Sequence, residues 1–220
     1  MPVPLPPLTI ENLKREAVAF AVTESKHSEP SLFGVTDGKA VGTYLEHKFQ
    51  TELLTRYAYP RGSSAKGIDF PGLDVDIKVT SIRQPQSSCP FKSARQKIYG
   101  LGYSLLVFVY DKRDDEAART ARLNILYTIF IEKDRTADFQ TSSGLLNLLK
   151  NQANREDILA FFAERMLPLD DISAGILIDE ILRNPPQVGY LTISNALQWR
   201  LQYGRAIEQA GLVSGLFRLE

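Results

Sequence analysis

In the first sixty residues of the chain, apolar side chains recur at the three- and four-residue spacing of amphipathic helices. This spacing predicts one helix over residues 9–26 and a second that is capped by Thr36 or Asp37 and runs to about Tyr57. The apolar stripe of the second helix consists of Val41, Leu45, Phe49 and Leu53. Glu46 lies at the edge of this stripe, where a carboxylate either reaches solvent or meets a metal ion or a lysine.

Further along the chain, the apolar pattern becomes that of a sheet. Residues 75–79 alternate between apolar and polar, as expected for a strand with one wet face. A continuous apolar run over residues 104–110 predicts a strand covered on both faces, and the Ile, Tyr, Thr and Phe content of residues 123–131 predicts another. The segments around these strands are expected to be a polar loop, a short helix and a charged loop, over residues 82–91, 92–99 and 111–119.

The last third of the chain is predicted to be mainly helical. Helices are expected over residues 145–151, 157–165, 172–182 and 192–210, followed by a closing strand or tail over residues 212–219. The last fifty residues are compatible with a winged helix-turn-helix, although we favour helices that pack on the core or form a dimer interface. We therefore expect an α/β core domain over residues 1–168 and a C-terminal helical segment over residues 169–220.

Composition narrows the class of protein. The 220 residues are 44% hydrophobic and 24% charged, which is typical of a globular domain with one sizeable core. No apolar run approaches the roughly 20 residues that span a bilayer, and the proline-rich arm over residues 1–8 lacks the pattern of a secretion signal. A single cysteine, Cys89, excludes a disulfide framework within the chain and a zinc site built from cysteines. We therefore expect a cytoplasmic protein without a membrane partner.

Charge is balanced overall but uneven along the sequence. The 26 basic and 26 acidic residues give a net charge of zero, which argues mildly against a nucleic-acid-binding domain. Between Asp76 and Asp111, however, there is no acidic residue. The same interval contains Lys78, Arg83, Lys92, Arg95 and Lys97. A locally positive surface of this kind is what a phosphate backbone requires, and ordinary solvated charges are the alternative.

The residues with the strongest chemical signal lie in and before the alternating strand. Asp76 and Lys78 are two positions apart and therefore point to the same face, about 6–7 Å apart along the strand. Pro71 and Gly72 suit a tight turn, which would fold Asp69 back toward Asp76. Two such carboxylates repel each other unless a cation lies between them. Surface ion pairs on a solvated strand are the alternative explanation of the pattern.

A hard metal ion fits the residue types of this stretch. Without histidine or cysteine nearby, the ligands would be oxygens, which favours Mg²⁺ bound by Asp69, Asp76 and Glu46. Such an ion polarises a phosphodiester and makes a water molecule more acidic, while Lys78 stabilises the negative charge that develops on the phosphate. The residues thus point to metal-dependent hydrolysis of a phosphodiester.

The order of helix, hairpin, helix and strand over residues 36–110 resembles the PD-(D/E)xK nuclease superfamily, which includes most type II restriction endonucleases. On this resemblance Asp69 and Asp76 are the two acidic residues of the motif, Lys78 is its lysine, and Glu46 is the glutamate of the preceding helix. One departure is that Ile68 stands where the family has proline. The resemblance implies a mixed central sheet flanked by helices, in a restriction endonuclease-like core.

The resemblance also implies a substrate and an assembly. It predicts a Mg²⁺-dependent, sequence-specific endonuclease that cuts double-stranded DNA as a homodimer, whose two-fold symmetry matches a palindromic target. In the family, the segment after the lysine often contacts DNA. Here that segment provides Arg83, Gln84, Gln86, Ser87, Lys92, Arg95 and Lys97. The alternatives are a repair or mobile-element nuclease that uses the same site, and a non-catalytic DNA-binding or structural protein on the same fold.

Other catalytic classes have little support in the sequence. With only two histidines, neither a histidine-based triad nor a zinc site is favoured, and His47 is most simply a surface side chain. Cys89 lies in a polar segment without an identifiable base. The GxxxxGK phosphate loop is absent from the sequence, so we expect no nucleotide cofactor.

Overall fold

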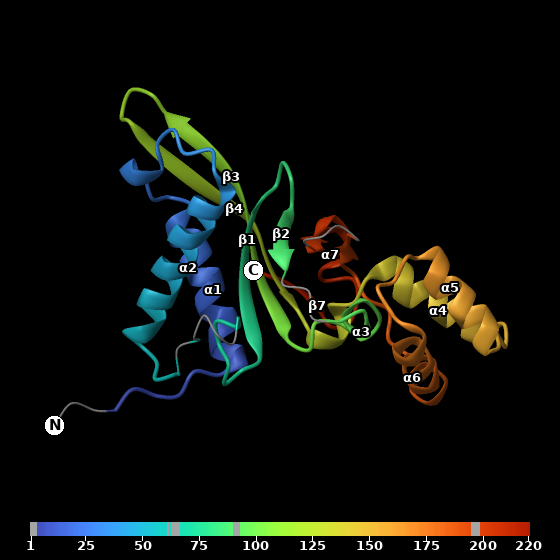
Figure 1. Cartoon of the computed structure of the whole chain (residues 1–220). Coiled ribbons are helices and arrows are strands. Elements are labelled where there is room, and N and C mark those ends of the chain that lie inside the picture. Colours follow the sequence, from blue (N-terminus) through green and yellow to red (C-terminus); the bar gives the residue numbers. More distant parts are fainter. Residues whose placement is uncertain (1–3, 61, 63–66, 90–92, 195–198) are drawn as a thin grey trace. The chain divides into compact units, whose positions relative to one another are not determined.

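The structure is a computed structural model that describes residues 4–60, 62, 67–89, 93–194 and 199–220 (Figure 1). Its helices are α1 (Ile10–Glu24), α2 (Gly38–Leu54), α3 (Arg95–Tyr99), α4 (Phe139–Lys150), α5 (Arg155–Glu164), α6 (Asp171–Arg183) and α7 (Gly204–Gln209), with short 3-10 turns at Pro30–Leu32 and Lys133–Arg135. Its strands are β1 (Val75–Ser81), β2 (Gln86–Cys89), β3 (Ser104–Asp115), β4 (Thr120–Ile131), β5 (Thr192–Ile193), β6 (Trp199–Gln202) and β7 (Leu216–Leu219).

The chain forms two compact units, each built from separate stretches of sequence. Unit 1 consists of Met1–Pro85, Leu105–Ile131 and Ala210–Glu220, and unit 2 consists of Gln86–Ser104 and Glu132–Gln209. The boundary expected between residues 168 and 169 therefore falls inside unit 2. Unit 1 contains every residue of the predicted catalytic set.

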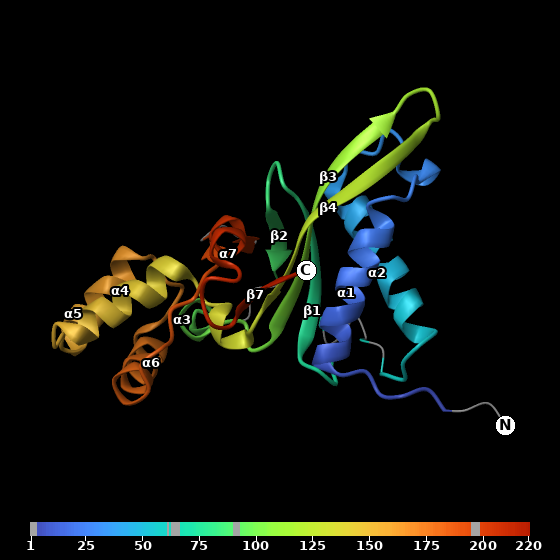
Figure 2. The same cartoon turned by 180° about the vertical axis from the view of Figure 1, so that it is seen from behind.

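Unit 1 is organised around a four-stranded sheet with the order β1-β3-β4-β7. Strands β3 and β4 are antiparallel, as are β4 and β7, whereas β1 and β3 run in the same direction in the two views of Figures 1 and 2. Helix α2 packs against β1, and α1 packs against β4 and β7. This arrangement confirms the prediction of an α/β fold with a mixed central sheet flanked by helices.

The two helices are held on the sheet by an aromatic cluster. Phe20 of α1, Phe49 of α2 and Phe108 of β3 contact one another with ring centroids 5.1–5.7 Å apart, and all three are buried. Truncating one such phenylalanine to alanine typically costs about 3–5 kcal/mol. The cluster therefore fixes the face of α2 that is turned toward β1.

Both helices begin at a residue whose side chain caps the first turn. Thr9 Oγ1 accepts a hydrogen bond from Asn12 N at the start of α1, and Asp37 Oδ1 accepts one from Lys39 N at the start of α2. Each cap satisfies a backbone N–H that has no partner within its helix. Of the two caps considered for the second helix, the structure uses Asp37.

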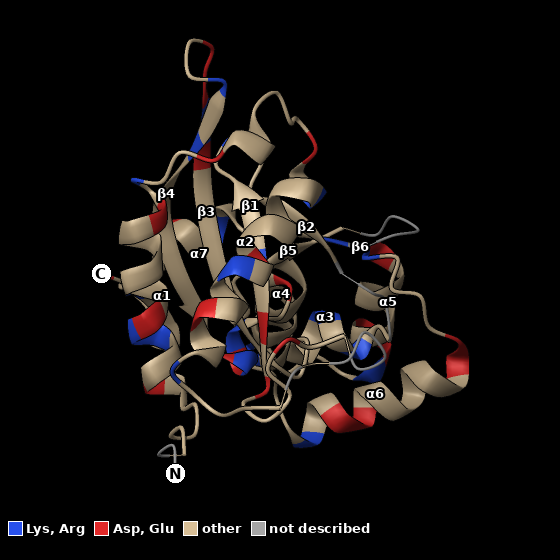
Figure 3. Cartoon of the chain, turned by 90° about the vertical axis from the view of Figure 1, so that its left-hand side faces the viewer, with Lys and Arg blue, Asp and Glu red and all other residues tan. Residues whose placement is uncertain are grey.

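The charged segment over residues 111–119 was expected to be a loop, and this prediction is wrong for its first half. Strand β3 continues to Asp115 and pairs with β4 as far as Thr120. Acidic and basic residues are mixed at the outer end of this hairpin (Figure 3). Alternating Asp and Lys or Arg side chains pair along the strand, as Lys112 does with Asp114 and Arg113 does with Asp111, so charge does not prevent the ladder from extending.

Unit 2 combines a three-stranded sheet with a small helical core. The sheet has the order β2-β6-β5, and both pairings are antiparallel. Helices α3, α4, α5 and α6 enclose a core that includes Ile98, Leu145, Ile158 and Ile181. The short helix, expected over residues 92–99, and the helices of α4, α5 and α6 are confirmed.

Two expectations for unit 2 are wrong. Residues 82–91 were expected to be a loop, yet residues 86–89 form β2, and the expected helix over residues 192–210 is replaced by β5, β6 and α7. The cause is tertiary, because β6 fills the place between β2 and β5 and buries Leu201. Without the helix over residues 192–210, the winged helix-turn-helix considered from the sequence does not form.

Among the described residues, no helix is long and apolar enough to cross a membrane.

Candidate active site

The candidate site lies where α2 packs on β1. One row of α2 faces the strand, with Gly42, Glu46 and Gln50 spaced four residues apart and therefore stacked one turn above the next. A Cβ at Gly42 would lie 3.9 Å from Val79 Cβ, so the helix and the strand meet at van der Waals distance there. The side chains of the following two turns, those of Glu46 and Gln50, are accordingly presented to the polar residues of β1.

A tight turn precedes the strand. Phe70 and Val75 form an antiparallel bridge in which Phe70 N donates to Val75 O at 2.9 Å, and Leu73 N donates to Phe70 O at 3.0 Å. The turn contains Pro71 and Gly72 as predicted. The residue with left-handed backbone geometry is Asp74 (φ 52°), not Gly72, and aspartate is one of the few residues other than glycine that tolerate this conformation.

The turn brings Asp69 back beside β1, as expected. Asp69 Oδ2 accepts a hydrogen bond of 2.8 Å from Ile77 N, and Oδ1 accepts one of 2.9 Å from Gln50 Nε2. The same carboxyl group neighbours Asp76 and raises the pKa of that residue. Asp69 is thus held by the helix on one side and by the strand on the other.

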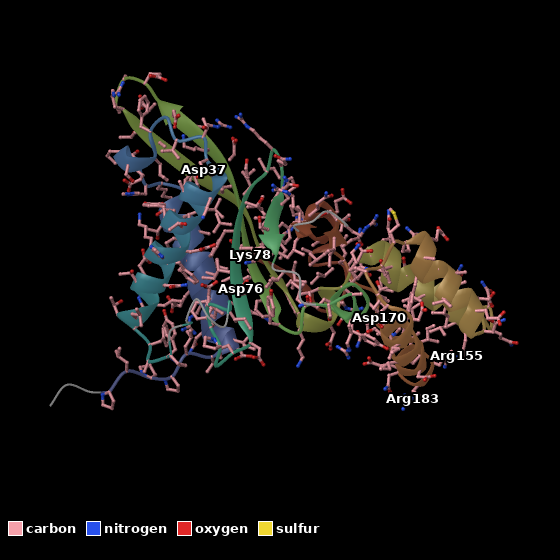
Figure 4. All side chains as sticks on the ribbon, viewed as in Figure 1. Asp37, Asp76, Lys78, Arg155, Asp170 and Arg183 are labelled. Carbon is pink, nitrogen blue, oxygen red and sulfur yellow. The ribbon has the colours of Figure 1, made fainter. Side chains whose placement is uncertain are left out.

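Asp76 and Lys78 are in direct contact on β1, near the centre of the strand (Figure 4). Lys78 Nζ lies 2.6 Å from Asp76 Oδ2, and the Asp76 residue is only 4% exposed. Despite this short distance, Oδ2 is a buried oxygen that has no hydrogen bond of good geometry within the described part of the chain. The lysine therefore compensates the charge of Asp76 while leaving an oxygen lone pair unused.

The protonation equilibria of the pair are strongly displaced. Burial raises the pKa of Asp76, the Lys78 ammonium opposes this rise, and the neighbouring Asp69 carboxyl adds to it. Burial by itself lowers the pKa of Lys78, but the acidic neighbours Asp76, Glu46 and Asp69 together outweigh it, and the net shift is upward. Lys78 is therefore a cation at neutral pH.

Glu46 belongs electrostatically to the same cluster. The pKa of Glu46 is raised to about 7, chiefly by burial and also by the negative charge of Asp69, while the Lys78 ammonium opposes the rise. A carboxyl group that titrates near neutrality can hold or release a proton at physiological pH. The structure thus brings together all four residues of the predicted catalytic set, namely Glu46, Asp69, Asp76 and Lys78.

The donor set of the site fits a hard divalent ion. Two neighbouring carboxyl groups, those of Asp69 and Asp76, provide an oxygen-only pair. Among the described residues, no group of three or more His, Cys, Asp or Glu side chains forms a ready-made metal cage. Mg²⁺ is usually bound through one or two carboxylates and keeps several waters, so a pair is sufficient.

The predicted DNA-contact residues have different environments. The Arg83 side chain is 80% exposed and lies 4.0 Å from Asp111, and Gln84 is also exposed. In unit 2, by contrast, Arg95 donates to both carboxylate oxygens of Glu180, and Ser87 Oγ lies 2.5 Å from Tyr203 Oη.

The other three predicted DNA-contact residues are Gln86, Lys92 and Lys97. Gln86 is part of β2 and pairs with Gln202 of β6. Lys97 is only 4% exposed, and burial lowers its pKa. A buried lysine is poorly placed to neutralise a phosphate on the surface, because its ammonium does not reach solvent. Lys92 lies outside the described residues.

Gln50 is a site residue that sequence reasoning missed. It is four positions after Glu46, and residues spaced in this way on a helix share a face. That spacing is the one signal in the sequence that could have identified it. Its amide donates to Asp69, which is 19 positions away.

Comparison with known proteins gives a consistent result. Residues 7–218 match the model of a family described as "Type II restriction enzyme NspV". A protein of Nostoc sp. with the same description is 65% identical over 209 residues, which cover 95% of each chain. No solved structure matches this chain.

Proposed function

The chain belongs to the family of the type II restriction enzyme NspV, and we propose that it is a sequence-specific endonuclease that hydrolyses phosphodiester bonds of double-stranded DNA. The observation that carries this proposal is the convergence of Asp69, Asp76 and Lys78 in a buried cluster, in which Asp76 is 4% exposed and its carboxylate is paired with the Lys78 ammonium. A surface ion pair on a solvated strand would not be buried in this way.

We assign Mg²⁺ as the cofactor, with Asp69 and Asp76 as its protein ligands and Glu46 as a further acidic partner. When bound, such an ion supplies positive charge at the scissile phosphate and makes a water molecule more acidic. The chain itself contributes the positions of the carboxylates, because the orientation of Asp69 is fixed by Gln50 and by the backbone of Ile77.

Lys78 provides the second positive charge of the site. Its ammonium lies against Asp76 and remains protonated, so it can donate hydrogen bonds to a phosphate oxygen as negative charge develops there. Glu46, with a pKa near 7, is suited to accept a proton from an attacking water. Each role depends on a group whose protonation state is set by its neighbours in the site.

Recognition of DNA is proposed to involve the turn that follows β1. Ser81 Oγ accepts a hydrogen bond from Arg83 N, and Gln84 N donates to Ser81 O, so the turn is anchored directly to the strand that carries Asp76 and Lys78. An exposed guanidinium and an exposed amide are suited to contact phosphates or base edges. We propose that the enzyme acts in the cytoplasm as a homodimer, since two-fold symmetry allows both strands of a palindromic site to be cut.

The test is incubation of the purified protein with plasmid DNA and Mg²⁺. Discrete fragments from the wild type, and their absence with Asp76→Ala and with Lys78→Ala, are the expected result. Asp134→Ala, which removes an exposed carboxylate elsewhere in the chain, is the matched control and should cut like the wild type. Equal cleavage by Asp76→Ala would refute the site, and DNA binding without any cleavage by the wild type would favour a non-catalytic protein.

A further inference from the structure

Gln50 is tied to the candidate site by its side chain. Its amide nitrogen donates a 2.9 Å hydrogen bond to Asp69 Oδ1, while the other oxygen of Asp69 accepts from Ile77 N at 2.8 Å. These two donors come from different elements, α2 and β1, and approach opposite ends of one carboxylate. The plane of the Asp69 carboxylate is therefore fixed.

The backbone of α2 is tied to the same turn at a second point. Tyr59 Oη donates a 3.0 Å hydrogen bond to Gln50 O, and the Tyr59 ring packs on that of Phe70 with centroids 5.3 Å apart. Phe70 immediately follows Asp69 and is buried. The position of Gln50 relative to Asp69 is thus determined by packing as well as by the amide hydrogen bond.

We propose that Gln50 is a positioning residue that orients Asp69 for binding of the divalent ion. This inference rests on the proposed function and extends it to a residue outside the acidic motif and its lysine. Each carboxylate oxygen can accept more than one contact, so the hydrogen bonds from Gln50 and Ile77 leave lone pairs available. They restrict rotation of the carboxylate and thereby remove an orientational cost from ion binding.

A neutral amide is well suited to this position. Glu46 lies one turn earlier on the same row of α2, and its carboxylate already repels those of Asp69 and Asp76. A second carboxylate at position 50 would increase this repulsion, and a lysine or arginine there would compete with the metal ion for Asp69. Glutamine donates a hydrogen bond without changing the charge of the site.

The experiment compares wild type, Gln50→Met and Gln140→Met by calorimetric titration with Mg²⁺ in the absence of DNA. Methionine retains the unbranched shape of glutamine but lacks the donor. Gln140 is an exposed glutamine in contact with Arg165, so its replacement is the matched control. We expect Gln50→Met to bind Mg²⁺ about 10-fold more weakly or worse, and Gln140→Met to bind like the wild type.

A second readout separates orientation from general damage. Mg²⁺ demands near-ideal octahedral geometry, so a loosened carboxylate should affect it more than it affects the larger Mn²⁺ ion. The ratio of cleavage with Mn²⁺ to cleavage with Mg²⁺ should therefore rise in Gln50→Met. Should that variant not fold, Gln50→Asn, which keeps the amide but shortens its reach, is measured in the same way.

Unchanged Mg²⁺ affinity together with an unchanged metal ratio would overturn the inference, whatever happens to thermal stability. That result is distinct from a failure of the proposed function. In the latter case the wild type itself would neither bind Mg²⁺ nor cut DNA, whereas failure of the inference alone leaves both properties intact in the wild type and in Gln50→Met.

Discussion

Lys78 Nζ lies 2.6 Å from Asp76 Oδ2, and both side chains come from one polar row of β1. Asp76 is 4% exposed, so without the lysine its carboxylate would be a buried charge with no ion-pair partner among the described residues. Removing one partner of a buried ion pair lowers the free energy of unfolding more than removing both partners does. The pair therefore couples the chemistry of the site to the stability of unit 1.

The first prediction concerns this pair. Lys78→Met should lower the free energy of unfolding by roughly 3 kcal/mol at pH 8, because it leaves Asp76 buried and charged. At pH 5 the loss should be smaller, since burial raises the pKa of Asp76 and the group can then be protonated. Urea unfolding of the metal-free protein at both pH values measures the difference. The double variant Lys78→Met/Asp76→Asn should recover most of the loss, and an equal loss at both pH values would contradict this reasoning.

The second prediction concerns Glu46 in the metal-free protein. Burial, together with the negative charge of Asp69, raises its pKa from about 4.5 to about 7, so the folded state favours the protonated form. The stabilisation is fully present below pH 4.5 and is lost as the pH rises through 7. The neutral variant Glu46→Gln should therefore match the wild type near pH 4 and be more stable at pH 8, by at most about 3 kcal/mol.

Urea unfolding in the presence of a chelator measures this pH dependence. Glu52→Gln, which changes a carboxylate on the same helix, is the control and should leave the pH profile of the wild type in place. A constant difference between Glu46→Gln and the wild type from pH 4 to pH 8 would rule out a raised pKa of Glu46.

The third prediction distinguishes Arg83 from Arg95, both of which are expected from the sequence to contact DNA. Arg83→Ala should weaken DNA binding and lower the dependence of log affinity on log salt concentration by about one unit, because the guanidinium is 80% exposed and its 4.0 Å contact with Asp111 is a weak one. Arg95→Ala should leave that slope unchanged, since Arg95 is held by Glu180. Fluorescence anisotropy with duplex DNA at several salt concentrations measures both. The opposite order of effects would place the DNA contact at Arg95.

The fourth prediction concerns the backbone beside Asp69. Gly62 N donates to Asp69 O at 3.1 Å, and a Cβ at Gly62 would lie 2.1 Å from Ile68 O. Gly62→Ala must therefore displace the segment that carries Asp69, and we expect Mg²⁺ binding and cleavage to fall at least 10-fold. Gly38→Ala, at an open position in the first turn of α2, should cut normally and be slightly more stable. Calorimetry and cleavage assays on both variants check this, and full activity of Gly62→Ala would show that Asp69 need not be held there.

The elements that surround the site could be predicted because their signals are local. The stripe of α2, its cap at Asp37, the turn before β1 and the continuous apolar run of β3 each follow from a few neighbouring residues. The convergence of Asp69 with Asp76 followed from the same turn. The secondary structure around the site could thus be predicted where residues that are close in sequence are also close in space.

The parts that could not be predicted depend on distant partners. Residues 199–202 form β6 because β2 and β5 lie on either side, and the sequence around Leu201 is equally compatible with a helix. Lys97 is part of α3, which has five residues and too few turns to show which face is buried. Gln50 has no property that separates it from a surface glutamine until Asp69 is brought beside it.

The hydrogen bonds that orient Asp69 span 19 positions to Gln50 and 8 positions to Ile77. The sheet beneath the site, by comparison, is completed by pairing β4 with β7, whose residues are separated by more than eighty positions. Closing a short loop costs less chain entropy than closing a long one, and local contacts form faster. The polar cluster therefore belongs to a segment able to organise early in folding, whereas the sheet that supports it is completed only when a much longer loop closes.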